Sequence, residues 1–394
     1  MRILYLHSTG AFGGSSRSLS EVCKLLSSSY DLSVITPPGS ASVFFARAGM
    51  RVHLARVSQF AVTRFGYYRG LRWLLLMREI LYFPITLYRL KRFLDSNAVD
   101  LVHLNEVTLL LWAVYLKRRG LPVVMHVRSV YKQFENSIRD RVFAMILRDY
   151  VDQVIAIDET VKRSLPAGVS AEVIHNSLRF PSGGPKLVTP SAHLSATLNV
   201  CIVANFIRVK GHYEFIGAAK LLLEKNLNIK FHIVGASIRK KHFFSWLLKF
   251  LGFYDDVESD IRRFVKENNM EGSVVFHGLV ENIDQFYSQM NLLCFPSYYD
   301  APGRPVFEAG FFGVPSLVAV RSPTPDTVVH LETGLVIEKP SVELIAAGIE
   351  KLYFDRSLLI ELGLGARGLA MKYYTLEKNV GNLMRVYMRV TQNR

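Results

Sequence analysis

Short apolar segments alternate with longer segments of helical periodicity along this chain, and the alternation runs twice. Runs of about five to eight residues rich in Val, Ile and Leu are typical of strands buried on both faces of a parallel sheet. Because parallel strands need a crossover, usually a helix, the alternation predicts repeated strand–helix units. The predicted strands are RILYLHS, DLSVITP, VDLVHLN, LPVVMHV and VDQVIAID, then LNVCIVANF, NIKFHIVG, SVVFHGL, MNLLCFPS and VPSLVAV.

A change in composition separates the two runs of strands. The segment PSGGPKLVTPSAHLSATL, which begins at Pro181, is rich in Pro, Gly, Ser and Thr and has no helical period. We therefore predict an α/β chain with a first domain over 1–180, a linker over 181–197, a second domain over 198–375 and a last helix over 376–394. Two doubly wound domains facing a central cleft would carry their chemistry in the loops after the strands.

Cysteine usage and hydropathy restrict the compartment. The three cysteines have no pair spacing, which argues against a disulfide framework or a zinc motif and favours a reducing environment. MRILYLHSTG lacks a small-residue cleavage site and is interpreted as a first strand, not as a signal peptide. The most apolar stretch, LRWLLLMREILYFPITLYRLKRF, is interrupted by charges and a proline, so we predict no transmembrane helix and a cytoplasmic protein.

Charge is concentrated in the first half of the chain. Residues 1–190 hold 25 Lys and Arg against 13 Asp and Glu, whereas residues 191–394 hold 23 against 20. Such an excess predicts an anionic partner for the first domain. Nucleic acid is not expected, because no RNA- or DNA-binding module is recognisable and the aromatic residues lie among leucines.

The stretch DAPGRPVFEAGFFGVP, from Asp300 to Pro315, combines features that suit a nucleotide-sugar. It follows the apolar run LLCFPS, and its proline at position 305 suits the first turn of a helix that ends near Gly313. Asp300 is predicted in the loop and Glu308 about one turn into the helix. Carboxylates can hold sugar hydroxyls, while Gly303 and the free N–H groups of the helix start can hold phosphate.

This pattern of strand, Pro-Ser, acid, glycine turn and second acid eight residues on resembles the paired-acid signature of the GT-B glycosyltransferases, and is closest to glycosyltransferase family 4. The family usually has Glu where this chain has Asp300. The resemblance implies that Glu308 holds the ribose hydroxyls, that Asp300 contacts the donor sugar, and that backbone near Gly303 and Arg304 binds the phosphates. It also implies two Rossmann-like domains and a last helix that returns to the first domain.

A second loop, VANFIRVKGHYEFIGAA, resembles the family's diphosphate clamp of Gly-Arg followed by Lys-Gly. Lys210 and Gly211 match that clamp, whereas Asn205 stands at the arginine position. Arg208 is the candidate for the missing charge. Because neutral hydrogen bonds are weaker than charge-assisted ones, Asn205 predicts weaker diphosphate binding than an arginine there would give.

Two loops of the first domain complete the candidates. STGAFGGSSRSL places Gly13 and Gly14 after the first strand and resembles the family's first glycine-rich loop, which meets donor phosphate or acceptor. Gly13 and Gly14 are therefore candidates for binding the nucleotide-sugar, and Ser15 and Arg17 are acceptor-side candidates. A plain tight turn explains the two glycines equally well.

His126, at the end of LPVVMHVRS, stands where members of the family often have a histidine that faces the donor sugar, and Arg128 would then point toward an anion in the same cleft. A structural role for His126 is an equal alternative. His103 and Asn105 are interpreted as structural.

The resemblance implies a retaining transferase that moves a hexosyl group from a nucleoside diphosphate sugar to a hydroxyl, with His126, Asp300 and Lys210 as catalytic candidates. No cofactor is expected, since the nucleotide-sugar is a substrate. No metal is expected either, because the chain has no Asp-x-Asp. The alternatives are a sugar-nucleotide epimerase of the same architecture and an inactive relative that binds sugar-nucleotide or lipid. By association with the family, polysaccharide biosynthesis is the expected process.

Two basic, aromatic segments predict contact with a membrane face. The residues from Arg64 to Arg92 include seven cations and one acid, Glu79, among tyrosines, phenylalanines and leucines, and RKKHFFSWLLKFLGF begins at Arg239. Basic residues suit anionic headgroups and aromatic residues suit the interface. The competing interpretation is that both apolar sets pack into ordinary cores. We expect peripheral attachment to an anionic inner membrane face and a lipid-linked or saccharide acceptor.

Overall fold

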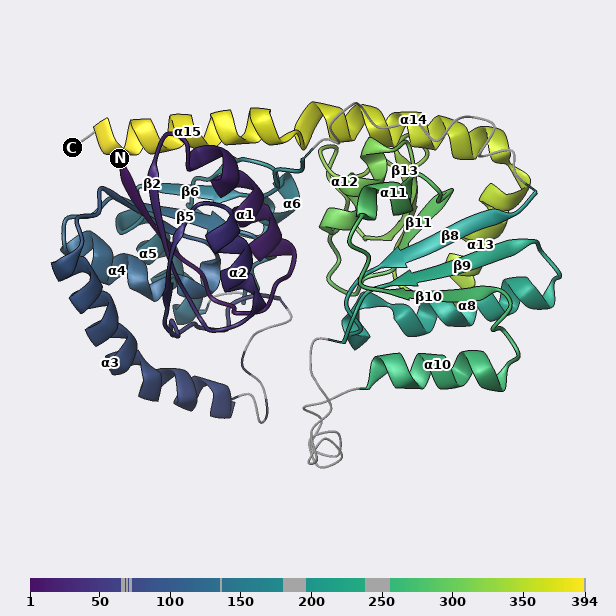
Figure 1. Cartoon of the computed structure of the whole chain (residues 1–394), viewed down its shortest axis with the longest axis horizontal. Coiled ribbons are helices and arrows are strands. Elements are labelled where there is room, and N and C mark those ends of the chain that lie inside the picture. Colours follow the sequence, from purple (N-terminus) through teal and green to yellow (C-terminus); the bar gives the residue numbers. More distant parts are fainter. Residues whose placement is uncertain are drawn as a thin grey trace. The chain divides into compact units, whose positions relative to one another are not determined.

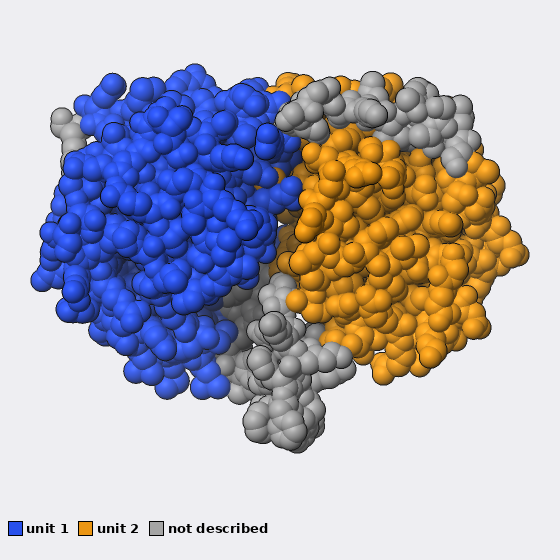
Figure 2. All heavy atoms as spheres, viewed as in Figure 1, with its two compact units in different colours: residues 1–179, 374–394 blue, residues 180–373 orange. Residues whose placement is uncertain are grey.

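The chain divides into two compact units in this computed structural model (Figures 1 and 2). Unit 1 comprises Met1–Arg179 and Tyr374–Arg394, and unit 2 comprises Phe180–Tyr373. The structure describes residues 1–64, 68, 70, 73–134, 137–179, 196–237 and 256–392. The predicted membrane segment from Arg239 and nearly all of the predicted linker lie outside these residues.

Unit 1 is built on a seven-stranded, wholly parallel sheet with the order β3-β2-β1-β4-β5-β6-β7. The central strands are buried on both faces, as their unbroken apolar sequence predicts. From β1 to β3 successive strands are added on one side of β1, and from β4 onward they are added on the other side. This reversal of strand order at β1 and β4 makes a doubly wound fold. The strands are β1 (Arg2–Leu6), β2 (Asp31–Thr36), β3 (Arg51–Leu54), β4 (Leu101–Leu104), β5 (Val123–Val127), β6 (Gln153–Ala156) and β7 (Glu172–Val173).

Helices cover both faces of this sheet (Figure 1). One core includes Leu90, Trp112 and Ile146 from α3, α4 and α5. The other includes Leu19 of α1 and Val386 of α15, the last helix of the chain. The helices are α1 (Gly14–Leu26), α2 (Ser40–Arg47), α3 (Trp73–Ser96), η2 (Val107–Leu109), α4 (Leu111–Arg118), α5 (Ile138–Asp149), α6 (Glu159–Arg163) and α15 (Leu376–Gln392).

Unit 2 repeats the plan with a six-stranded parallel sheet in the order β10-β9-β8-β11-β12-β13. The α/β prediction of two parallel, Rossmann-like sheets is therefore confirmed. The strands are β8 (Leu198–Val203), β9 (Ile229–Val234), β10 (Val274–Gly278), β11 (Leu292–Phe295), β12 (Ser316–Ala319) and β13 (Gly334–Ile337). The helices are η3 (Arg208–Lys210), α8 (His212–Glu224), α10 (Val257–Glu267), α11 (Ile283–Tyr287), α12 (Arg304–Phe311), α13 (Val342–Phe354) and α14 (Arg356–Tyr373).

The helix α3 carries most of the described part of the predicted membrane segment. Phe83, Leu87 and Leu90 turn inward to the core, and the Phe83 ring stacks on Trp112 at 4.6 Å. A set of large apolar side chains nevertheless remains exposed on α3, and we call it the α3 stripe: Trp73, Leu74, Met77, Ile80, Leu81, Tyr82, Ile85 and Tyr88. Within the described ranges, no helix combines the length and the hydropathy that a membrane crossing requires.

Candidate functional site

The turn after β11 in unit 2 is held in place from two sides. The N–H of Tyr298 donates to the carbonyl of Val209 at 2.9 Å, which joins this turn to the loop after β8. Asp300 has a φ of 55°, a left-handed conformation that Asp tolerates better than most residues. Its carboxylate accepts hydrogen bonds from the backbone N–H of Arg321 at 2.8 Å and from that guanidinium at 2.7 and 3.0 Å. Arg321, just beyond β12, was not foreseen from the sequence.

The helix α12 begins where the sequence predicts it. Gly303 is its N-cap residue, and a proline occupies the first turn, where the missing N–H costs nothing. A Cβ built at Gly303 would lie 2.4 Å from Cζ of Phe295, so any other residue here would require the Phe295 ring to shift. The first turn of α12 therefore lies beside the Phe295 ring. The N–H groups of this turn have no partner inside the helix.

Glu308 lies one turn into α12 and is nearly buried. Its Oε1 accepts a hydrogen bond from Nε of Arg304 at 2.6 Å, and its Oε2 accepts one from the Tyr287 hydroxyl at 3.3 Å. The Glu308 and Arg304 side chains are only 11% and 8% exposed. A carboxylate held this firmly is pre-oriented, and it retains lone pairs that can accept further hydrogen bonds.

Lys210 lies beside the same turn. Its Nζ is 5.3 Å from the centroid of the Phe295 ring and 4.6 Å from that of Tyr299. Burial lowers the pKa of Lys210 to about 8. Among the described residues, no carboxylate pairs with this ammonium group, so an anion that reaches it meets an uncompensated charge.

The Lys-Gly pair has a steric cause. Gly211 has a φ of 79°, and a Cβ there would lie 2.0 Å from the carbonyl oxygen of Pro296. Only glycine therefore lets the Lys210 loop approach the turn that leads to Asp300. Arg208 is exposed and lies 5.9 Å from the Tyr213 ring on α8, and Asn205 is in the loop directly after β8. The structure thus gathers Lys210, Phe295 and the start of α12, with Arg208 and Asn205 on the adjoining loop.

A second polar cluster lies at the carboxyl edge of the sheet in unit 1. Arg128, just after β5, donates from Nε to Oδ1 of Asn105 at 2.8 Å and from Nη1 to Oδ1 of Asn176 at 2.9 Å. The Asn105 amide is 2.9 Å from Nδ1 of His7, whose Nε2 is 3.0 Å from the Ser16 hydroxyl of α1. The cluster therefore connects three strand ends to the first turn of α1.

His126 adjoins this cluster and is 4% exposed. Its Nδ1 is 3.3 Å from Nη2 of Arg128, and its ring centroid is 5.4 Å from that of His103. Burial, followed by the charge of Arg128, lowers the pKa of His126 well below its ordinary value, so the imidazole is neutral. Its Nε2 is buried without a hydrogen-bond partner in the described part of the chain.

The other candidates of unit 1 lie around this cluster. Asn105, expected to be structural, bonds Arg128, and His103 bonds the Tyr387 hydroxyl of α15 through Nδ1 at 2.7 Å. Gly13 is the N-cap of α1, and a Cβ at Gly13 or Gly14 would meet nothing within 4 Å. Arg17 pairs with Glu21 of the same helix, and Ser15 lies in its first turn. No sequence pattern points to His7, Ser16 or Asn176, because each is a common polar residue and each comes from a different segment.

Two family models match this chain in succession. The model of glycosyltransferase family 4 matches residues 12–178, and the model of glycosyl transferases group 1 matches residues 193–367. Within the parts of the chain that the structure describes, no group of three or more His, Cys, Asp and Glu side chains is arranged to hold a metal ion.

Relatives and solved structures agree with these matches. The chain is 28% identical over 165 residues to the capsular polysaccharide biosynthesis glycosyltransferase CapM of Staphylococcus aureus. That alignment covers 42% of this chain and only about two fifths (39%) of CapM. Anabaena Alr3699/HepE, solved in complex with UDP and glucose, superposes with a TM-score of 0.73 at 17% identity and covers 98% of this chain and 99% of its own. The lipopolysaccharide outer core galactosyltransferase WaaB, in its apo form, gives 0.62 at 14% identity over 98% and 100% of the two chains. At such identities the two structures establish the fold alone.

Proposed function

From the premise that this chain belongs to the group 1 and family 4 glycosyltransferases and has their GT-B fold, we propose that it transfers a hexosyl group from a nucleoside diphosphate sugar to a hydroxyl, with retention of configuration. The observation that carries the proposal is the position of Lys210 beside the Phe295 ring, which also adjoins the start of α12. No carboxylate in the described part of the chain pairs with this ammonium group. A diphosphate needs this combination of positive charge and free N–H groups.

The donor proposed is a UDP-sugar, with UDP-glucose as the first compound to test, because the HepE structures contain UDP and UDP-glucose. In this assignment Glu308 accepts hydrogen bonds from the ribose hydroxyls, and Asp300, held by Arg321, shapes the turn that contacts the sugar. Lys210, Arg208 and Asn205 bind the diphosphate together with the backbone at Gly303 and Arg304. The charge on the departing diphosphate is then stabilised by groups that are already in position.

Unit 1 is assigned to the acceptor and to the reacting hydroxyl. The neutral imidazole of His126 has a buried Nε2 with no hydrogen-bond partner in the described ranges, and this atom can hydrogen bond a sugar hydroxyl without adding charge. Arg128, fixed by two asparagines, supplies a positive charge for an acceptor that carries phosphate, and the first turn of α1 from Gly13 to Arg17 adds N–H groups. No metal enters this scheme, in which the charge of Lys210 and the N–H groups of the α12 start stabilise the negative charge of the phosphates.

Melting temperatures in the presence of nucleotide-sugars test the donor. Because a ligand that binds only the native state raises its stability by about 2.7 kcal/mol at one hundred times Kd, the true donor class is expected to shift the melting point clearly. We expect UDP-glucose or another UDP-sugar to raise the melting temperature more than GDP-mannose or free glucose does. The absence of any shift across the panel would contradict the proposal, and a shift without turnover in the presence of acceptors would indicate an inactive relative.

We also propose that unit 1 rests on an anionic membrane surface through the α3 stripe, which would bring the enzyme to a lipid-linked acceptor. Eight large apolar side chains, with Leu81 73% and Met77 60% exposed, follow one another at helical spacing on a segment with a net positive charge. Arg89, Lys91 and Arg92 lie at its carboxyl end. Basic residues near an anionic surface add roughly 1 kcal/mol each.

Co-sedimentation with vesicles of phosphatidylcholine and phosphatidylglycerol tests this attachment. The double variant Met77→Glu/Leu81→Glu is expected to reduce the pelleted fraction at least about fivefold, because it places two negative charges on the apolar stripe. The matched control Leu364→Glu/Phe354→Glu changes side chains of similar exposure, 60% and 71%, in unit 2 and should pellet like the parent protein. Equal pelleting of both variants at low salt would refute the role of α3.

A further inference from the structure

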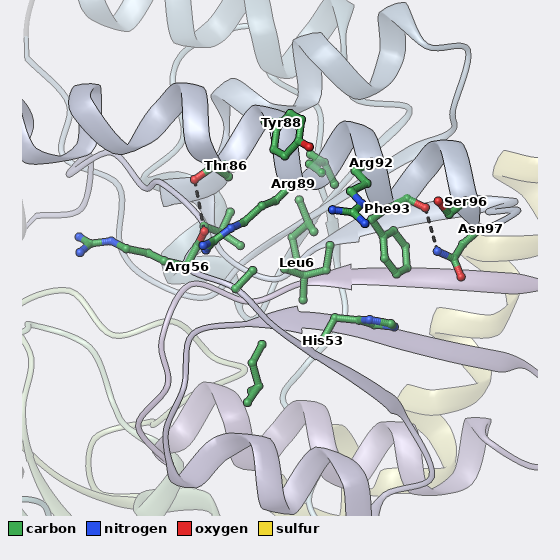
Figure 3. Close-up of a pocket in the computed structure, with 15 residues that line it drawn as sticks. Leu6, His53, Arg56, Thr86, Tyr88, Arg89, Arg92, Phe93, Ser96 and Asn97 are labelled. Carbon is green, nitrogen blue, oxygen red and sulfur yellow. Dashed lines mark hydrogen bonds between the residues drawn. The ribbon is translucent and has the colours of Figure 1, made fainter.

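A cavity of about 420 Å³ lies in unit 1 between α3 and the carboxyl ends of β1, β2 and β3 (Figure 3). Its volume is in the range usual for ligand pockets. None of the residues assigned above to donor, acceptor or catalysis lines it. Its lining is Leu6, Ile35, His53, Leu54, Ala55, Arg56, Val57, Thr86, Tyr88, Arg89, Leu90, Arg92, Phe93, Ser96 and Asn97.

The inner wall of this cavity is apolar. Leu6 and Ile35 come from the ends of two strands, Val57 follows β3, and Leu90 faces them from α3. Thr86, the polar group on this wall, is occupied, because its hydroxyl donates to the Arg56 carbonyl at 3.2 Å and accepts from the N–H of Ser58. Against this inner wall a sugar or a base would find few hydrogen-bond partners, whereas a hydrocarbon chain needs none. The other polar side chains of the lining, such as His53, Ser96 and Asn97, are not part of this wall.

Two arginines at the rim have no partner among the residues that the structure describes. Arg89 and Arg92 make no hydrogen bond or ion pair with any of these described residues. Figure 3 shows both side chains leaving α3 on the side of the cavity, with Arg89 directed toward Arg56 and Arg92 near Phe93. Arg56 differs, since its guanidinium pairs with the buried carboxylate of Glu79 and stacks on the Tyr82 ring at 4.4 Å. Within the described part of the chain, no carboxylate compensates these two positive charges, which lie beside the apolar inner wall of the cavity.

The cavity also adjoins the α3 stripe. Tyr88, which is 64% exposed, belongs to the stripe and lines the cavity. A surface that approaches the stripe therefore approaches the cavity opening as well.

We propose that this cavity binds one acyl chain of an anionic phospholipid, with the lipid phosphate held between Arg89 and Arg92. Arginine suits phosphate because its fork of N–H donors can hold two oxygens at once. The lipid would anchor α3 more firmly than surface contact alone, since it adds buried apolar area to the electrostatic attraction. The inference rests on the proposed membrane attachment only for how α3 meets the lipid, and it concerns neither the donor nor the transfer.

Calorimetric titration of the whole protein with a short-chain lipid tests the proposal without a membrane. The probe is dioctanoyl phosphatidylglycerol below its micelle concentration, compared with dioctanoyl phosphatidylcholine and with glycerol phosphate. Three variants are titrated: Arg89→Gln/Arg92→Gln, the filling variant Ala55→Phe, and the matched control Lys91→Gln/Arg118→Gln. The control removes two positive charges from exposed residues of unit 1 that do not line the cavity.

We expect the native protein to bind phosphatidylglycerol at least about tenfold more tightly than either comparison compound. The arginine variant and the filling variant should each lose at least about tenfold in affinity, and the control should change less than about twofold. Equal weakening in the control, binding of glycerol phosphate as tight as that of the lipid, or no binding by the native protein would overturn the proposal. UDP-glucose binding measured on the same samples reports separately on the donor site.

Discussion

Replacing Glu308 by alanine is expected to abolish measurable binding of UDP-glucose. In the proposed site this carboxylate accepts hydrogen bonds from two ribose hydroxyls, and bonds to a charged group contribute about 1.5–3 kcal/mol each. Their loss corresponds to roughly a hundredfold to ten-thousandfold weaker binding. Isothermal titration with UDP-glucose, on protein shown to be folded by its melting curve, measures the effect.

The structure adds a second consequence of the same change. Glu308 and Arg304 are both nearly buried, and removal of the carboxylate leaves the guanidinium with one charged partner fewer. Breaking a buried pair in this way costs about 3–5 kcal/mol of stability, so the melting point of Glu308→Ala should fall. The double variant Arg304→Met/Glu308→Leu removes both charges and should melt closer to the parent protein while still failing to bind the nucleotide.

Asp300→Asn is the companion measurement. The Asn side chain retains one oxygen for Arg321 but loses the charge, so the turn loosens without being lost. We expect about tenfold weaker binding of UDP-glucose, clearly less than in Glu308→Ala. Near-normal affinity in Glu308→Ala would contradict the assignment of Glu308 to the ribose. A larger loss of affinity in Asp300→Asn than in Glu308→Ala would indicate that Asp300, and not Glu308, binds the ribose hydroxyls.

Binding of UDP is expected to weaken as the pH rises through about 8, because burial lowers the pKa of Lys210 to about 8. Below that pH the free protein presents the ammonium group to the diphosphate. Above it, a proton must be taken up on binding, and affinity falls up to about tenfold per pH unit until the pKa of the complex is reached. Titrations of UDP between pH 6.5 and 9.5, about three units chosen to span this pKa, measure the dependence.

Lys210→Met keeps the length of the side chain and removes the charge. The variant should bind UDP about ten to one hundred times more weakly at pH 7, and its affinity should no longer depend on pH across this window. Arg208→Met, on the same loop but exposed, should weaken binding less and keep the pH dependence. The same pH profile in Lys210→Met and in the parent protein would exclude Lys210 as the responsible group.

The lowered pKa of Lys210 also predicts that the stability of the protein without ligand rises over the pH window in which its affinity for UDP falls. A lysine whose pKa is lower in the folded than in the unfolded state binds fewer protons when folded, so this group makes the free energy of unfolding increase between pH 8 and about 10.5. Lys210→Met should lose this increase. Stability that rises while UDP affinity falls over the same pH window would distinguish Lys210 from a general alkaline loss of structure.

The buried strands were predictable, and the missed strands share a physical cause. Every strand predicted from an apolar run is present in the sheets. The strands β3, β7 and β13, which were not predicted, all lie at sheet edges. An edge strand has one neighbour and is partly open to solvent, so its sequence, such as RVHL in β3, need not be a long apolar run.

The candidate site shows the same division. The turn near Asp300 and the Lys-Gly loop were recognisable because each is a short segment with several special residues in fixed order. The partners that hold them were not, since Arg321 for Asp300 and Tyr287 for Glu308 come from other segments and are ordinary residue types. For α3, the alternation of cations and apolar residues suggested a surface segment, and the exposed stripe appeared only when the helix was packed on its sheet.

The sequence by itself determined the two parallel sheets and a helix start near Gly303, because these depend on local backbone preferences and on the period of apolar residues. The reason that glycine follows Lys210, contact with the Pro296 carbonyl, came only from the tertiary structure. Only the tertiary structure decided that Arg304 pairs with Glu308, that His7, Asn105 and Arg128 meet at one sheet edge, and that a cavity remains beneath α3. The physical reason is that such contacts join residues far apart in the chain. Such contacts form only when the helices and strands pack together, and no periodic pattern within a single segment predicts them.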